Sequence, residues 1–163
     1  MGFFPACLPL VPSILVLMMC GTAPSHAQST QIPGEMAASE RTLMAGSFAT
    51  ERLWLWQKRL NLEAWNISIV VSRAADLKPK TVGNIKWDRD KKTAVIRILD
   101  PADYHMAFEP MLKDIEFTVV HELIHLEMSP VLSDLQRTEA NRREEEFAVN
   151  HMTDALLKLD RGQ

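Results

Sequence analysis

Apolar residues first recur at a regular interval between residues 38 and 61, in the stretch ASERTLMAGSFATERLWLWQKRLN. The recurring positions are Leu43, Phe48, Leu53, Trp56 and Leu60. Spacing of this kind gathers apolar side chains on one side of a helix and predicts an amphipathic α-helix here. Asn61 is expected to end that helix, because asparagine readily adopts the left-handed conformation in which many helices stop.

Two strand-forming stretches follow the predicted helix. The segment WNISIVVSR, which begins at Trp65, is rich in β-branched residues and predicts a first strand. Residues 82–99 contain two apolar arms separated by the charged segment 88–92, a pattern typical of a β-hairpin that turns at the charges. The Asp100-Pro101 pair is expected to end the second arm.

A longer apolar run, residues 115–128, has hydrophobic side chains on nearly every side of a helix. A helix of that kind is typical of the buried centre of a domain. Its end is expected at Met128-Ser129-Pro130, because proline disrupts the interior of a helix. A last helix is expected to begin between residues 134 and 138 and to end near residue 159.

The order of these elements is one helix, three strands and two helices, which predicts an α+β domain over residues 38–163. The composition agrees with a folded domain, since 47% of the residues are hydrophobic and 24% are charged. A net charge of −3 gives no indication of a surface that binds nucleic acid. Neither pattern nor composition indicates an oligomeric state.

The first 27 residues have the features of a secretory signal peptide. An apolar stretch, densest from Ile14 to Cys20, precedes Ser25-His26-Ala27, which resembles a signal-peptidase site. Cleavage after Ala27 would leave a polar, turn-rich leader over residues 28–37. We therefore expect an exported protein, periplasmic or secreted, with no stable membrane span after cleavage. An uncleaved anchor is the alternative.

Both cysteines, Cys7 and Cys20, lie in the predicted signal peptide. The mature chain would contain none, which excludes disulfides, thiolate metal ligands and cysteine nucleophiles from it. Any metal in the mature protein must therefore be held by histidines and carboxylates.

The segment VVHELIHLEM, residues 119–128, has a spacing that indicates a specific chemistry. His121 and His125 would lie on one face of the helix, where two imidazoles can occupy two corners of a tetrahedral zinc site. Glu122 would lie beside that site, where a general base for hydrolysis is needed. The alternative is a buried helix with incidental histidines, but burying these groups without partners would cost on the order of several kcal/mol.

Catalytic zinc commonly takes a third protein ligand, and the last predicted helix carries three consecutive glutamates. Its expected apolar face consists of Ala148, Val149, Met152, Ala155, Leu156 and Leu159. Glu145 lies in the middle of this face, whereas Glu144 and Glu146 lie at its edges. Because a buried carboxylate needs compensation, Glu145 is the expected third ligand and Glu146 is the alternative.

The motif HELIH at residues 121–125 followed by Glu145 resembles the gluzincin type of zinc metallopeptidase. The stretch EFAVN from Glu146 and the hairpin arm GNIKWD from Gly83 resemble segments of small phage-type and ImmA/IrrE-like metallopeptidases. The resemblance covers about residues 50–159 and implies a minimal zincin-like fold with one zinc ion per chain. Larger gluzincins support the metal site with an acidic residue four positions after the glutamate ligand. That position is Val149 here, or Asn150 if Glu146 is the ligand.

The activity that this resemblance implies is hydrolysis of a peptide or protein substrate, with Glu122 as general base. One arm of the hairpin would then border the cleft as an edge strand. Candidates for a further donor to the oxyanion, or for supporting the ligands, are Tyr104, His105 and His151. Two alternatives stay open: a non-catalytic zinc-binding or peptide-binding module on the same scaffold, and a zinc amidase that acts on cell-wall crosslinks.

Overall fold

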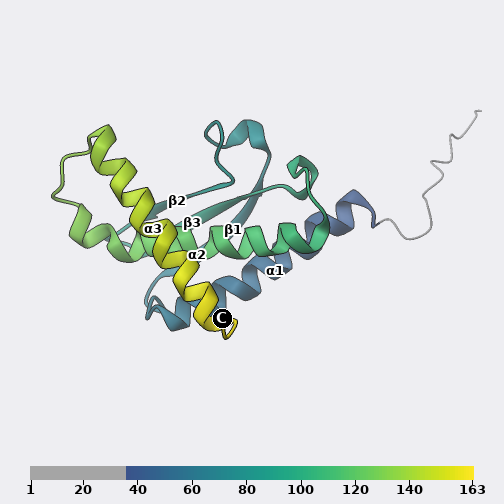
Figure 1. The fold of residues 1–163 in the computed structure, drawn as a ribbon, viewed down its shortest axis with the longest axis horizontal. Coiled ribbons are helices and arrows are strands. Elements are labelled where there is room, and N and C mark those ends of the chain that lie inside the picture. Colours follow the sequence, from purple (N-terminus) through teal and green to yellow (C-terminus); the bar gives the residue numbers. More distant parts are fainter. Residues whose placement is uncertain (1–35) are drawn as a thin grey trace, which may run out of the picture. The chain divides into compact units, whose positions relative to one another are not determined.

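The structure is a computed structural model that describes residues 36–163. The predicted signal peptide, 1–27, lies outside the described residues, as does all of the predicted leader except its last two residues. The elements are α1 (Ala38–Arg59), β1 (Asn66–Ser72), β2 (Gly83–Asp88), β3 (Thr93–Leu99), α2 (Phe108–Leu132) and α3 (Glu139–Asp160) (Figure 1). This order confirms the predicted α+β domain.

The sheet is mixed and has the strand order β1-β3-β2. β1 runs parallel to β3, with Ile69 opposite Ile96, whereas β2 runs antiparallel to β3 and places Ile85 opposite Ile96. The predicted hairpin over residues 82–99 is therefore confirmed, with its turn between Asp88 and Thr93. The hairpin leaves β2 at one edge of the sheet.

The first helix confirms the predicted limits and the predicted stop. Asn61 has a φ of 56°, and the N–H groups of Asn61 and Leu62 donate to the carbonyls of Lys58 and Gln57, which closes the helix end. The buried face differs in part from the expected one, because Leu43 is 72% exposed. In the N-terminal half of α1, the buried face consists of Ala45 and Ala49, whose small side chains let the helix backbone approach the sheet closely.

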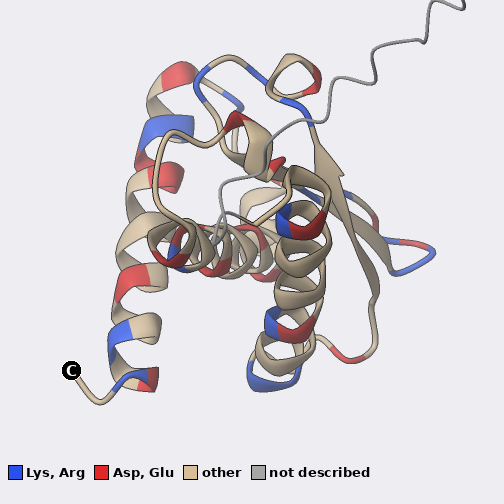
Figure 2. Ribbon diagram, turned by 90° about the vertical axis from the view of Figure 1, so that its right-hand side faces the viewer, with Lys and Arg blue, Asp and Glu red and all other residues tan. Residues whose placement is uncertain are grey.

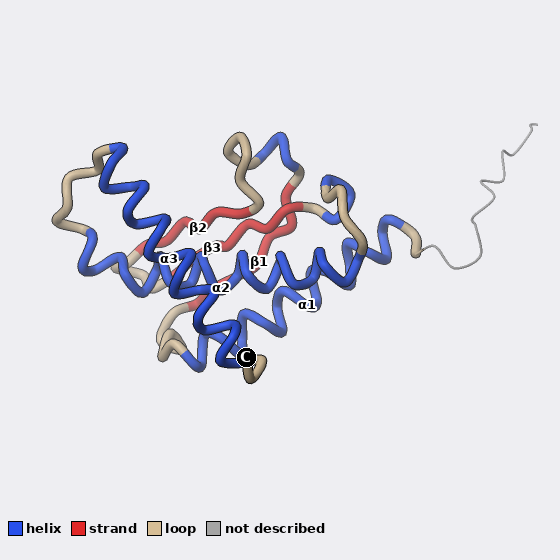
Figure 3. Tube along the Cα trace, viewed as in Figure 1, coloured by secondary structure: helices blue, strands red, loops and turns tan. Residues whose placement is uncertain are grey.

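The second helix, α2, lies at the centre of the fold, against the sheet and between α1 and α3 (Figure 3). Ile115, Val119 and Leu123 are fully buried, as expected for a helix that is apolar on nearly every side. The predicted end at Met128-Ser129-Pro130 is wrong, because α2 continues to Leu132. Pro130 removes a single backbone donor near the end of the helix, where that loss is tolerated.

The last helix, α3, begins as predicted, directly after Thr138, whose hydroxyl accepts a hydrogen bond from the Asn141 N–H. Its buried residues are Val149, Thr153 and Leu157. This face is rotated from the expected one, in which Met152 and Leu159 were included. Met152 is 38% exposed and Leu159 is 74% exposed.

A buried carboxylate on α2 holds the ends of the other two helices. Glu116 is 6% exposed and accepts hydrogen bonds from Trp56 Nε1 at 3.4 Å and from Arg161 Nη2 at 2.9 Å. Nη1 of Arg52 lies 3.6 Å from the same carboxylate. Because Arg161 follows α3 directly, this network fixes the end of α3 against α1 and α2.

Candidate metal centre

Two histidines project side by side from α2, one helical turn apart. The Nε2 atoms of His121 and His125 are 3.0 Å apart, and the ring centroids are 4.7 Å apart in an edge-on arrangement. The i, i+4 spacing on a straight helix produces this arrangement, as the sequence predicts. Both rings therefore present one nitrogen to the same point.

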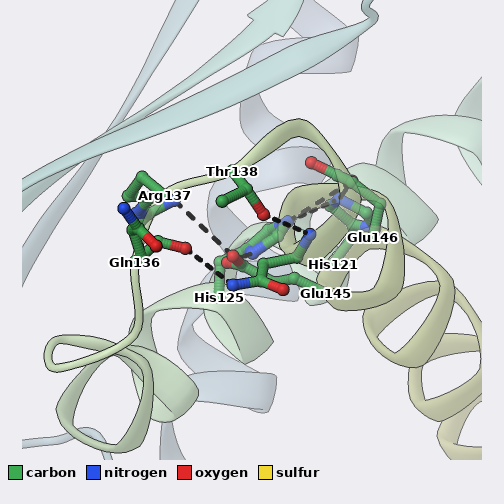
Figure 4. Close-up of polar contacts among 8 residues, drawn as sticks. His121, His125, Gln136, Arg137, Thr138, Glu145 and Glu146 are labelled. Carbon is green, nitrogen blue, oxygen red and sulfur yellow. Dashed lines mark hydrogen bonds and ion pairs between the residues drawn. The ribbon is translucent and has the colours of Figure 1, made fainter.

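Glu146, on α3, directs its carboxylate to that point (Figure 4). Its Oε2 lies 3.3 Å from Nε2 of His121 and 3.6 Å from Nε2 of His125. One ligand atom from each of the three residues lies within 4.8 Å of the others. A tetrahedral zinc site with bonds of about 2.0–2.2 Å separates its ligand atoms by about 3.3–3.6 Å, so the three side chains fit a zinc ion with little rearrangement.

Glu145, the expected third ligand, takes a different position. Its Oε1 lies 2.9 Å from Nδ1 of His125, on the side of the ring away from the cluster, and its Oε2 lies 3.5 Å from Nη1 of Arg137. The structure thus favours Glu146, the alternative, as the third ligand. A carboxylate only accepts, so Nδ1 of His125 carries the proton and its Nε2 presents a lone pair to the metal position.

The surroundings of His121 keep its imidazole in the form that binds a metal. Burial lowers the pKa of His121, as does the nearby His125, whereas Glu146 and Asn150 act in the opposite direction. A neutral ring is the ligand form. Nδ1 of His121 is buried and has no hydrogen-bond partner among residues 36–163, although Asn150 lines the same cavity one turn after Glu146.

Glu122 is 7% exposed and lines the same cavity as the two histidines. Burial, and next the charge of Glu146, raise the pKa of Glu122 to about 7. A carboxyl group with that pKa can take up and release a proton near neutral pH. β2 passes close to it, since a Cβ on Gly83 would lie 3.5 Å from Oε1 of Glu122 and 2.4 Å from Cγ2 of Thr118.

The cluster opens into a cavity of about 540 Å³. Its walls come from the loop before β2, from β2 itself, from α2, and from the start of α3 together with the loop that precedes it. Gly83, Ile85 and Trp87 line it, so the edge strand runs along one side of the cavity. An opening of this size beside a three-ligand cluster can admit a substrate to the metal position.

The candidates for a further donor do not reach this cavity. The Tyr104 hydroxyl donates to Oδ2 of Asp114 at 2.9 Å, and His151 lies against Phe147 with ring centroids 4.1 Å apart. None of Tyr104, His105 and His151 lines the cavity. The Tyr104 hydroxyl already donates to a carboxylate, and His151 is directed elsewhere on α3. Neither is available to stabilise an oxyanion at the cluster.

Sequence reasoning missed a second group of residues at the cavity. Its walls carry five basic side chains: Lys78, Lys80, Arg137, Arg142 and Arg143. Two come from the loop between β1 and β2, and the others come from the α2–α3 loop and the start of α3. Because these segments lie about sixty residues apart in the sequence, neither spacing nor periodicity connects them. Three of the five, at 137, 142 and 143, lie close together in the sequence, but Glu139 lies among them and three glutamates follow, so no local signal indicates a cationic surface.

Comparisons of the chain with protein-family models, with curated proteins and with solved structures found no match. The resemblance to gluzincins therefore stays a prediction. Within residues 36–163, no helix is long and apolar enough to cross a membrane.

Proposed function

We propose that the protein is a zinc-dependent metallopeptidase of the gluzincin type, built on a minimal zincin-like domain. The observation that carries this proposal is the convergence of two histidine Nε2 atoms and one glutamate oxygen within 4.8 Å. Glu122 lies beside them in a cavity large enough for a peptide segment. A structural metal site would need neither an open cavity nor a second buried carboxyl group next to the ligands.

His121, His125 and Glu146 would hold the zinc ion. Bound there, zinc supplies a Lewis acid that polarises an amide carbonyl and makes a water molecule acidic enough to react at neutral pH. Glu145 fixes the ring of His125 through Nδ1, and Arg137 holds the carboxylate of Glu145 in turn. Such supporting contacts orient the ligands and raise their affinity for the metal.

Glu122 would act as the proton carrier. Its carboxylate takes a proton from the attacking water and returns it to the nitrogen of the leaving amine. The low exposure of Glu122 excludes bulk water from this exchange, and a pKa near neutrality suits both directions of transfer. The positive charge of a bound zinc would lower this pKa and favour the carboxylate that accepts the first proton.

β2 offers a means of holding an extended peptide in the cavity. Within residues 36–163 it pairs with β3 on one side only, so backbone groups on its other edge could pair with a substrate strand, apart from the Ile85 backbone, which hydrogen-bonds Glu122. Main-chain pairing of this kind holds a peptide in register without demanding a particular sequence. The scissile amide would lie over the cluster while its neighbours extend along β2.

The first test is the zinc content of the purified protein, measured by elemental analysis, together with cleavage of a quenched fluorescent peptide library. We expect about one zinc per chain and cleavage that is lost in Glu122→Gln while zinc is kept. Zinc bound without cleavage of any peptide would favour the non-catalytic module. Cleavage of peptidoglycan stem peptides alone would favour the cell-wall amidase. Absence of zinc after reconstitution would refute the metal centre.

A further inference from the structure

The basic side chains at the cavity outnumber its acidic ones. Five lysines and arginines line it, against three carboxylates, Glu122, Glu145 and Glu146. All three carboxylates belong to the metal centre described above. The entrance is therefore cationic even though the whole chain carries a net charge of −3. Figure 2 shows basic and acidic residues in alternation along α3, the helix that ends at the C-terminus. The excess of positive charge is therefore confined to the cavity.

Three of these basic side chains have no ionic partner among residues 36–163. Arg137 lies 3.5 Å from Glu145, and Arg142 lies 3.9 Å from Glu139. Lys78, Lys80 and Arg143 form no ion pair within the part of the chain that the structure describes. A bound zinc ion would add two further positive charges, which Glu146 and the ionised Glu122 would offset. The free cations are therefore available to an incoming anion.

The three free cations come from two separate segments. Lys78 and Lys80 lie in the loop that leads into β2, which Leu77, buried at 7% exposure, anchors to the core. Arg143 lies in the first turns of α3, directly before the glutamates of the metal centre. A peptide that passes through the cavity would thus meet positive charge contributed by both β2's loop and α3.

We propose that this cavity selects peptides that carry carboxylate side chains close to the scissile bond. The inference rests on the proposed peptidase function and names its substrate class. Like charges concentrated around a cleft attract a substrate of opposite charge and repel one of the same charge. Because Lys78, Lys80 and Arg143 lie at the exposed rim, they act mainly on the rate of association, and salt weakens their effect.

Binding to zinc-loaded Glu122→Gln protein tests this selectivity without turnover. The probes are three peptides of equal length, acetylated and amidated, with glutamate, glutamine or lysine around the central bond, and a fourth neutral peptide with a free C-terminus. Measured by calorimetry at low salt, the glutamate peptide should bind about tenfold tighter than the glutamine peptide, and the lysine peptide weakest. A preference for the free C-terminus alone would overturn the assignment to side-chain carboxylates.

A charge-reversed variant should bind the lysine peptide more tightly, and misfolding cannot produce such a gain in affinity. Adding Lys78→Glu and Lys80→Glu to the Glu122→Gln background should abolish the preference for glutamate and strengthen binding of the lysine peptide. The control is the double variant Lys58→Glu/Lys113→Glu, which makes the same change in net charge, because both lysines are exposed on helices and neither lines the cavity. Equal shifts in both variants would mean that the effect is net charge and would overturn the inference.

Cleavage by the wild-type protein separates this inference from the proposed function. If all three peptides are cleaved with equal kcat/KM and equal salt dependence, the charge selectivity is refuted while the peptidase stands. If none is cleaved but the glutamate peptide still binds preferentially, the peptidase is refuted and the cationic cavity stands as a binding site.

Discussion

The three consecutive glutamates of α3 allow a sharp test of the metal centre. Glu146 lies near both Nε2 atoms, Glu145 contacts only Nδ1 of His125, and Glu144 is exposed and contacts neither ring. Each substitution to glutamine removes the same charge from adjacent positions of one helix. The expected effects on zinc affinity therefore differ only through the contact that each carboxylate makes.

The magnitudes follow from the two kinds of contact. Structural zinc sites bind with about 10–16 kcal/mol over four ligands, or about 2.5–4 kcal/mol per ligand, so Glu146→Gln should weaken zinc binding about 10²–10³-fold. Glu145→Gln keeps an oxygen that accepts from Nδ1 and should cost less than about tenfold. Glu145→Ala removes the acceptor and should cost about 10–100-fold. Glu144→Gln should change nothing measurable.

Zinc dissociation constants can be measured by competition with a chromogenic chelator at pH 7.5, with circular dichroism of each variant to confirm the fold. The graded order from Glu144 to Glu146 is the prediction. If Glu145→Gln loses more affinity than Glu146→Gln, then Glu145 is the ligand and the arrangement of the two carboxylates described above is refuted. Equal losses in all three variants would show that only the total negative charge of the helix matters.

Three further predictions concern the scaffold and the general base. Gly83→Ala should destabilise the protein by about 1–3 kcal/mol in urea unfolding, because its Cβ would lie 2.4 Å from Thr118 Cγ2, whereas Gly46→Ala, with 3.7 Å to its nearest side chain, should be tolerated. Glu116→Ala should cost about 2–3 kcal/mol in the same assay, since it leaves the partly buried Arg161 and Arg52 unpaired, and a loss below about 1 kcal/mol would contradict the helix-holding role. In metal-free protein, Glu122 keeps its proton in the folded state up to about pH 7 but releases it near 4.5 when unfolded. The unfolding free energy should therefore fall as pH rises through that window, by at most about 3 kcal/mol, and Glu122→Gln measured at pH 5 and pH 8 should lack this fall.

The fold could be predicted from the sequence wherever a local rule applied. Asn61 ends α1 through its own conformational preference, and the charged turn between β2 and β3 follows from the residues within it. The expected end of α2 was wrong because a local rule was applied too strictly. α2 continues past Pro130, although proline favours a break there, because a helix can lose one hydrogen bond near its end.

The candidate metal centre could be predicted only in the part that lies on one helix. The spacing of His121 and His125 requires no knowledge of the tertiary fold, and the structure brings their rings together. The third ligand depends on how α3 is rotated against α2. Neighbouring residues on a helix point about 100° apart, so Glu145 and Glu146 meet His125 from different sides. Glu145 is the more buried of the two, with a side chain 11% exposed against 49% for Glu146, yet it contacts Nδ1 and not Nε2. Burial alone therefore could not identify the carboxylate nearest the two Nε2 atoms.

Glu145 and Glu146 have the same side chain but contact different atoms of His125. Glu146 reaches the Nε2 side of His125 and Glu145 reaches its Nδ1 side, so the two carboxylates lie on opposite edges of one ring. Because Arg137 compensates Glu145, Glu146 and the ionised Glu122 would offset the charge of a bound metal. The positive charge at the cavity would then come mainly from the free cations of its rim. Arg137 orients Glu145, and Glu145 in turn orients the ring of His125. Arg137→Gln removes that orientation but also removes a positive charge near the metal position. The two effects oppose each other, so the zinc dissociation constant from chelator competition should change by less than about tenfold, while Lys78 and Lys80 stay able to attract substrate.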